Sequence, residues 1–138
     1  MKQKVAPLIV VEGITDVAFL QSFLDADFIT TNGSDVPRET IEYIRQAKKT
    51  RDVVVLTDPD APGKRIRDVL DQEIPGLLHA YINKADAVKK NKVGVAESNQ
   101  EAVLEALQVL PELMFLVGEF LIVHLLNILL IQIQSRIL

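Results

Sequence analysis

The sequence predicts an α/β protein, in which a parallel sheet of about four strands is flanked by helices and followed by an apolar C-terminal helical segment. The first observation is that residues 8–11 and 53–56 are short apolar runs, typical of strands buried in a parallel sheet. The second is that such runs alternate with segments whose apolar residues recur at helical spacing. This alternation favours right-handed crossovers between parallel strands.

The first half of the domain is predicted to hold two strands and two helices. Thr15 is expected to cap the first helix, in which Val17 and Leu20 belong to the apolar stripe. Asn32 and Gly33 tolerate positive φ, so they predict a turn. The predicted elements are a strand at residues 8–11, a helix at 15–24, a strand at 28–31, a turn at 32–34 and a helix at 37–49.

The second half continues the same alternation. Ile66, Val69 and Leu70 form the apolar stripe of a third helix, and Asn99 is expected to cap a fourth, which Pro111 ends. The predicted elements are a strand at residues 52–57, a helix at 63–70, a strand at 77–82, a polar lysine-bearing loop at 83–93 and a helix at 99–110.

The chain changes character after this helix, so residues 1–110 are expected to form the domain and residues 111–138 an apolar tail. The uncharged stretch at 120–135 is short for a membrane span and lacks the period of an amphipathic surface helix. Three alternatives stay open, namely a membrane anchor, a helix buried in a partner and a frameshift product. Membrane insertion is disfavoured because Glu119, His124 and Asn127 interrupt the longer apolar run at 113–133, and a charged group at mid-bilayer costs about 2.5–3.5 kcal/mol.

Composition excludes several classes of protein. The chain has no cysteine, so it has neither a disulfide framework nor a cysteine-ligated zinc site. The N-terminus lacks the apolar region of a secretory signal, and we expect a cytoplasmic protein. The net charge of −4 argues against a globally basic nucleic-acid-binding protein but allows a local basic surface.

Three carboxylates follow the two clearest strands, and they are the strongest functional signal. Glu12 comes directly after residues 8–11, and Asp58 and Asp60 come just after residues 53–56. The carboxyl ends of parallel strands form sites at one edge of a sheet, where three carboxylates repel one another unless a cation is present. Ligands that are all oxygen suit Mg²⁺, which works with a few carboxylates and substrate phosphates. The sequence therefore predicts a magnesium site for phosphodiester chemistry.

Other charged residues have two interpretations. Asp16 is either an acid that complements the N-terminus of the first helix or a further metal ligand. The basic residues near these acids either form a solvated surface or contact RNA phosphates, which would make binding salt-sensitive. These basic residues are Lys64, Arg65 and Arg67 after the aspartate pair, and Lys84, Lys89 and Lys90 in the polar loop. His79, in a predicted strand, is expected to be structural.

Two motifs resemble the signature of the Toprim domain, a catalytic domain shared by topoisomerases, bacterial primases and certain nucleases. The first is Glu12-Gly13 followed by Asp16, and the second is Asp58-Pro59-Asp60 followed by Gly63. The resemblance extends from residue 8 to about residue 110. It implies that the predicted domain is a Toprim catalytic domain.

A closer resemblance is to the ribonuclease M5 family, bacterial enzymes that mature 5S ribosomal RNA. Three stretches are similar to that family, at residues 31–34, 56–67 and 75–82. The resemblance implies a Mg²⁺-dependent endoribonuclease that hydrolyses a 5S ribosomal RNA precursor and reads it mainly by shape. It also implies a protein partner, the ribosomal protein that presents 5S RNA.

The resemblance also implies the roles of the acidic residues. Glu12, Asp58 and Asp60 would be catalytic, and these three with Asp16 would bind Mg²⁺ as two ions. Asp58 and Asp60 would hold the metal, while Glu12 would bridge to it or act as the general base toward water.

The chain departs from the ribonuclease M5 pattern at several positions. The family has a basic residue at the place of Ile14 and an acid at that of Thr15, and here Ala96 stands before Glu97 where the family has Glu directly after Gly-Val. The apolar tail replaces the polar, basic C-terminal half of the family, so this region looks truncated or aberrant. Two alternatives therefore remain, namely another Toprim nuclease or primase-like protein, and a truncated non-catalytic module that binds RNA or metal.

Overall fold

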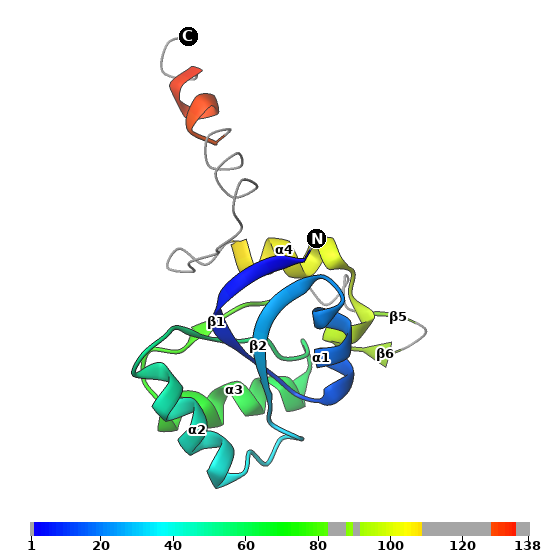
Figure 1. The fold of residues 1–138 in the computed structure, drawn as a ribbon. Coiled ribbons are helices and arrows are strands. Elements are labelled where there is room, and N and C mark those ends of the chain that lie inside the picture. The colour runs from blue at the N-terminus through cyan, green and yellow to red at the C-terminus, as the bar shows by residue number, and fades with distance from the viewer. Residues whose placement is uncertain (1, 83–87, 90–91, 109–127, 135–138) are drawn as a thin grey trace.

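The computed structural model describes residues 2–82, 88–89, 92–108 and 128–134. The main sheet and its helices follow the predicted alternation of strands and helices (Figure 1). In chain order these elements are β1 (Gln3–Val11), α1 (Ile14–Gln21), β2 (Leu24–Thr30), α2 (Arg38–Lys48), β3 (Val53–Val55), α3 (Ala61–Glu73), β4 (Leu78–His79), β5 (Val88–Lys89), β6 (Lys92–Val93), the 3₁₀ helix η2 (Val95–Glu97) and α4 (Gln100–Gln108).

The four-stranded sheet has the order β2-β1-β3-β4, and all of its pairs are parallel. The apolar run of β1 pairs on both sides, with Val10 opposite Ile29 of β2 and Val55 of β3. The prediction of a four-stranded parallel α/β sheet is therefore confirmed. The first and third strands of the chain lie side by side at its centre, so the segments that follow them leave the sheet at neighbouring points.

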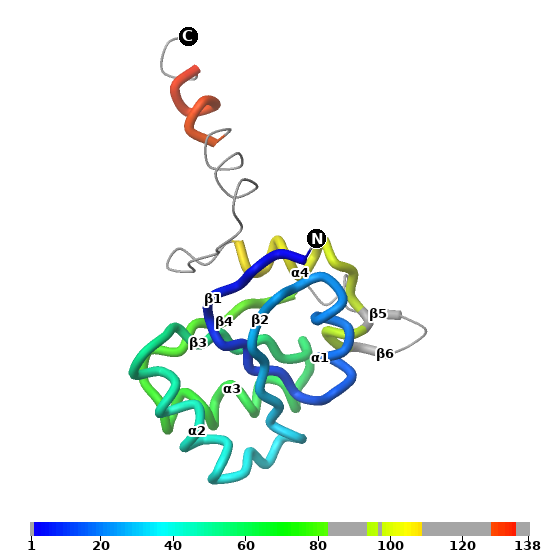
Figure 2. Tube along the Cα trace, viewed as in Figure 1, coloured from blue at the N-terminus to red at the C-terminus, as the bar shows by residue number. Residues whose placement is uncertain are grey.

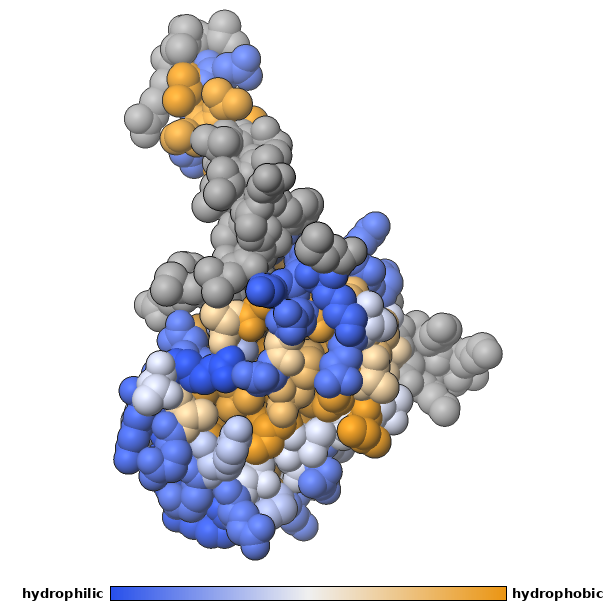
Figure 3. Space-filling model, viewed as in Figure 1, coloured by the Kyte–Doolittle hydropathy of each residue, from blue (hydrophilic) through white to orange (hydrophobic). Residues whose placement is uncertain are grey.

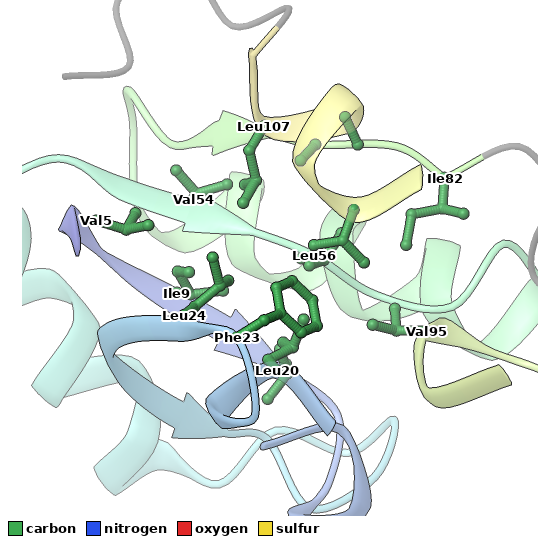
Figure 4. Packing of buried hydrophobic residues seen from close by; sticks show 14 of the residues in the cluster. Val5, Ile9, Leu20, Phe23, Leu24, Val54, Leu56, Ile82, Val95 and Leu107 are labelled. Atoms are coloured by element: carbon green, nitrogen blue, oxygen red, sulfur yellow. The ribbon is translucent and has the colours of Figure 1, made fainter. Parts of the chain in front are cut away.

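Alternate residues of the central strands supply two separate cores, one on each face of the sheet. Ile9 faces α1 and α4, whereas Val10 faces α2 and α3. In Figure 4, Leu20 of α1 and Leu107 of α4 lie in one packed group with Leu56, which follows β3. Helices α2 and α3 lie beside each other on the opposite face (Figure 1, Figure 2). Because both faces are covered, the central strands are apolar without alternation.

The boundary between the first helix and the second strand was predicted wrongly. Helix α1 ends at Gln21, and Leu24 opens β2 opposite Gln3 instead of closing the helix. Leu24 fits the helical spacing, but its side chain is 1% exposed and packs in the core from the strand. The predicted cap is also wrong, because the N-cap is Gly13 and Thr15 lies inside the helix.

Strand lengths also differ from the prediction. Strand β1 begins at Gln3 rather than residue 8, and its pairing with β2 shifts register between Lys4 and Leu8. Pro7 lies in this irregular stretch, where its missing N–H breaks no regular pairing. Strands β3 and β4 are shorter than predicted, although Ala80 still donates to the carbonyl of Val55 at 3.0 Å.

Two predicted segments are described only in part. The polar loop contains β5 and β6, whose antiparallel pairing sets Lys89 opposite Lys92, while Lys84 and Lys90 lie outside the described residues. Residues 128–134 of the tail are helical, and five of their apolar side chains are exposed (Figure 3). None of the helices in the described ranges is long and apolar enough to cross a membrane.

The start of α3 depends on a close approach between Gly63 and the loop before it. The Asp60 side chain caps the helix by accepting from the Gly63 N–H at 2.8 Å. A Cβ atom on Gly63 would lie 2.0 Å from the carbonyl oxygen of Asp58. Glycine is therefore required here because of the crowded main chain, and its φ plays no part in the requirement.

We predict that Gly63→Ala will displace the Asp58–Asp60 loop and lower the free energy of unfolding. The cost should be at least the roughly 1–3 kcal/mol that overpacking produces, because the obstructing atom is main-chain carbonyl oxygen and not a flexible side chain. Urea unfolding of the variant measures it. Gly13→Ala is the matched control, since a Cβ at Gly13 meets nothing within 4 Å. Equal losses in the two variants would contradict the role given to Gly63.

Candidate metal centre

The acidic site lies at the carboxyl ends of β1 and β3. Because these strands are neighbours and parallel, Glu12 after β1 and Asp58 after β3 leave the sheet at the same edge. The Asp58 N–H donates to Glu12 Oε1 at 3.0 Å, which places the two residues in direct contact. The predicted convergence of Glu12 with the aspartate loop is therefore confirmed.

Each of the four predicted acids accepts a hydrogen bond from a main-chain amide. Glu12 accepts from Asp58, and Asp58 Oδ1 accepts from the Val95 N–H at 2.6 Å. Asp60 accepts from Gly63 in the same way. Asp16 Oδ2 accepts from the Gly13 N–H at 3.1 Å, so it serves the helix terminus as one interpretation predicted. These bonds fix the acids in place and leave further carboxylate lone pairs, since each ionised carboxylate offers about four acceptor sites.

Burial and neighbouring charges raise the pKa values of Glu12 and Asp58. Partial burial raises the pKa of Glu12 to about 7, and the charges of Asp58, Asp60 and Asp16 add to this rise. Burial likewise raises the pKa of Asp58 to about 6, with further contributions from Asp16 and Asp60. The amide hydrogen bonds to Glu12 and Asp58 act in the opposite direction, because they favour the ionised carboxylate. The four side chains thus form one electrostatic unit.

This donor set fits Mg²⁺ in its chemistry. All four groups are carboxylates, the hard oxygen ligands that this ion takes, and a cation would relieve their mutual repulsion. Across the described ranges, however, no three His, Cys, Asp or Glu side chains already stand as a metal-ligating group. Asp58 and Asp60 direct oxygens to main-chain amides instead. Any metal bound here therefore requires side-chain rotations or bridging water.

The predicted basic residues of α3 divide into two kinds. Lys64 and Arg65 are exposed, as a phosphate-contacting or solvated surface requires. Arg67 is 7% exposed, and its guanidinium donates to the carbonyls of Val55 at 3.1 Å and Ala80 at 2.6 Å. The expectation that Arg67 lies on the outer helix face with the other two is corrected, because its side chain links the ends of β3 and β4.

Arg67 also organises the residues at the end of β4. Its Nη1 lies 3.0 Å from His79 Nδ1, and since arginine can only donate, Nδ1 accepts. His79 Nε2 then carries the proton and donates to Asp71 Oδ1 at 2.7 Å. These contacts agree with the structural role predicted for His79. The guanidinium carbon of Arg67 lies 4.2 Å from the centre of the Tyr81 ring.

Sequence reasoning missed three contributions to the site. The inward position of Arg67 could have been found, because Gly63, Ile66, Arg67 and Leu70 follow the spacing of one helix face. Tyr81, which lines a pocket beside Asp58 and Asp60, was not singled out, because it fell within the strand predicted at residues 77–82 and its exposure appears only in the structure. Nothing in the sequence indicated that the main-chain amide of Val95 would contact Asp58. The Glu97 side chain lies outside the described residues.

The fold and the acidic motifs define a Toprim domain. Residues 7–97 match the Toprim domain family, and the chain belongs to that family. A solved structure titled as a small TOPRIM domain protein from Bacillus stearothermophilus superposes with a TM-score of 0.63. At 24% identity, covering 75% of this chain and 87% of the other, that likeness supports the fold alone.

More specific relatives carry the name ribonuclease M5. The chain is 43% identical to the Bacillus subtilis protein over 107 residues, which cover 76% of this chain and 58% of the relative. It is 42% identical to the Listeria monocytogenes protein over 109 residues, covering 78% and 57%, and 42% identical to the Staphylococcus aureus protein over 105 residues, covering 75% and 59%. The predicted resemblance to this family is therefore confirmed, although the chain spans less than two thirds of these relatives' length.

The raised pKa values predict how stability depends on pH in the metal-free protein. Glu12 and Asp58 titrate higher when folded than their ordinary values of 4.5 and 3.8, so the folded state binds more protons in the acidic range. The contribution of these two groups to the free energy of unfolding should therefore be greatest below about pH 4 to 5, and it should fall as the pH rises toward about 7. Thermal unfolding in EDTA across this range measures the decline.

Addition of Mg²⁺ and the substitution Glu12→Gln each test the cause of that decline. Mg²⁺ should reduce it, because a bound cation stabilises the ionised carboxylates and binding adds to folded-state stability. Glu12→Gln should flatten the profile, because it removes the group with the larger shift. Stability that rises steadily over the same range in EDTA, and is unaffected by Mg²⁺, would contradict the raised pKa values of Glu12 and Asp58.

Proposed function

We propose that the chain is a Mg²⁺-dependent endoribonuclease of the ribonuclease M5 type, acting on a 5S ribosomal RNA precursor. The observation that carries this proposal is the contact of Glu12 with Asp58 at the carboxyl ends of the two central strands. It occurs in a domain about 40% identical to proteins of that name. Such a substrate would be met in the cytoplasm, presented by the ribosomal protein that binds 5S RNA. We assign residues 1–110 to the catalytic domain and residues 111–138 to a separate tail.

The acids have distinct proposed roles. Glu12, Asp16, Asp58 and Asp60 would hold Mg²⁺, as two ions, with Glu12, Asp58 and Asp60 as the catalytic residues. When bound, Mg²⁺ supplies charge neutralisation at the phosphate and activation of water. Glu12 would either bridge to the metal or act as the general base that accepts a proton from water. The amides of Asp58 and Val95 keep Glu12 and Asp58 oriented during this transfer.

Binding of RNA would use exposed cations near the acids. Lys64 and Arg65 project from the first turns of α3, directly after the acidic loop, where they can contact phosphates on either side of the scissile bond. We extend the same proposal to the polar loop and its lysines Lys84, Lys89 and Lys90. We give Arg67 a supporting role instead, because its donors are engaged by main-chain carbonyls.

A second candidate is a Toprim module that binds metal and RNA without turnover. The observation that favours it is that no three acidic side chains in the described ranges already stand as a metal-ligating group. Another Toprim nuclease or a primase-like protein would share the same acidic site. Metal and RNA binding without cleavage would select the non-catalytic module, and cleavage of RNA other than the 5S precursor would select another nuclease.

We predict that Asp58→Asn abolishes Mg²⁺-dependent RNA cleavage, by at least about 10²-fold, because it removes a ligand charge and perturbs its neighbour Glu12. The asparagine carbonyl can still accept from the Val95 amide, so the fold should be retained. Gel analysis of a 5S precursor with Mg²⁺ measures cleavage, and circular dichroism checks the fold. Asp25→Asn is the matched control, since Asp25 is exposed near the start of β2, at the opposite end of the sheet from the acids, and belongs to no proposed site. Undiminished cleavage by Asp58→Asn would exclude it as a ligand.

We also predict that replacing Lys64 and Arg65 with Ala weakens RNA binding and reduces its salt dependence by roughly one unit of slope per lost phosphate contact. Binding measured by fluorescence anisotropy at several salt concentrations gives that slope. The matched control replaces Lys48 and Lys49 at the end of α2, where Lys48 lines a hollow with Ala6 and Asp52 at the opposite end of the sheet. Equal slopes for both double variants and the unmodified chain would show that Lys64 and Arg65 are only solvated.

A further inference from the structure

A pocket of about 530 Å³ opens directly beside the acidic loop. It runs between the start of α3 and the segment that leaves β4, and its volume lies within the range of about 300–1,000 Å³ typical of small-ligand sites. Six of its lining residues matter here, namely Asp58, Asp60, Lys64, Asp68, Asp71 and Tyr81. A group bound in this pocket would therefore adjoin the proposed metal ligands.

Tyr81 gives the pocket an aromatic wall that is held in place. Its side chain is 67% exposed, which is unusual for a large ring, while the Arg67 guanidinium lies over the ring, 4.2 Å from its centre. The His79 ring is nearly parallel to it, at 20° and 6.2 Å between centres. Because Arg67 is itself fixed by the carbonyls of Val55 and Ala80, the ring rests on a fixed group, while its high exposure leaves much of it accessible to a ligand.

The charges of the pocket decide which part of a nucleotide it can take. Asp68 and Asp71 are carboxylates on its α3 side, and they repel phosphate while accepting hydrogen bonds from N–H groups. Lys64 is the exposed cation among the lining residues, suited to a phosphate outside the pocket. An open aromatic face with acceptors beside it matches a nucleobase, which has a flat π-face and N–H donors at its edge.

We propose that this pocket binds one unpaired nucleobase of RNA, stacked on Tyr81, next to the phosphate that enters the acidic site. Stacking on a ring requires a base freed from its duplex, so the site selects a nucleotide that is single-stranded or displaced from its pair. This inference rests on the proposed function for its RNA substrate. Its test uses binding alone, so that it is independent of cleavage.

The test compares two short RNA backbones, one carrying a single 2-aminopurine among abasic residues and the other wholly abasic. The full chain, in Mg²⁺, should bind the first about 5- to 100-fold more tightly, the gain that stacking of one base gives. The fluorescence of 2-aminopurine should be quenched on binding. Gel analysis of the RNA after each titration verifies that it is intact.

Variants separate the ring from general effects. Tyr81→Ala should abolish both the affinity difference and the quenching, whereas Tyr81→Phe should retain them because the ring is kept. Tyr81→Leu covers Arg67 without an aromatic face and should behave like Tyr81→Ala. It replaces Tyr81→Ala in the test if the alanine variant folds poorly. Tyr43→Ala is the matched control, since Tyr43 is the other exposed tyrosine, at 58%, and does not line the pocket.

The outcomes separate this inference from the proposed function. A base-dependent affinity that needs Tyr81, in a chain that cleaves no RNA, would support the pocket and select the non-catalytic module. If the unmodified chain cleaves RNA, but the Tyr81→Ala variant retains both the affinity difference and the quenching, the proposed nucleobase pocket is overturned and the proposed function is not. Equal binding of the two backbones by the unmodified chain would also overturn it.

Discussion

The acidic site depends on four main-chain amides that each hold one carboxylate. They belong to four parts of the domain, namely the N-cap of α1 (Gly13), the segment after β3 (Asp58), the first turn of α3 (Gly63) and the start of η2 (Val95). These amides are fixed by the fold, and they position the acids before any cation binds. Burial raises the pKa values of Glu12 and Asp58, and the charges of neighbouring acids add to the rise. Carboxyl groups perturbed in this way are characteristic of functional sites, where local stability is given up for chemistry.

The sequence was sufficient to predict the alternation of parallel strands with helices and the meeting of Glu12 with the aspartate loop, because both follow from apolar runs and their order. A strand that is apolar on both faces must be central in a parallel sheet, and acids just beyond two such strands must share an edge. The boundary at Leu24 could not be predicted in this way. Its position satisfies the helical stripe and the strand equally, and only the pairing with Gln3 across the sheet decides between them.

Arg67 shows why side-chain roles were harder to predict than backbone positions. Its charge and its neighbours Lys64 and Arg65 suggested a phosphate-binding surface, but the carbonyls that engage it belong to β3 and the segment after β4. These carbonyls become available only once the sheet ends are arranged in space. A buried guanidinium is stable because several acceptors satisfy its fixed donors, and the structure supplies them from three residues, Val55, Thr57 and Ala80.

The positions of these residues separate two tasks within the molecule. Every acid of the site, with the amide of each and the Arg67 support, lies within residues 7–97, the part that matches the Toprim family. Under the proposed function, metal and phosphate chemistry is assigned to this part of the chain. Selection of one RNA among many needs a larger surface than the acidic edge and the adjoining pocket provide, because shape readout spans several phosphates. Under the same proposal, substrate choice and bond cleavage would be physically distinct, and a change in one need not disturb the other.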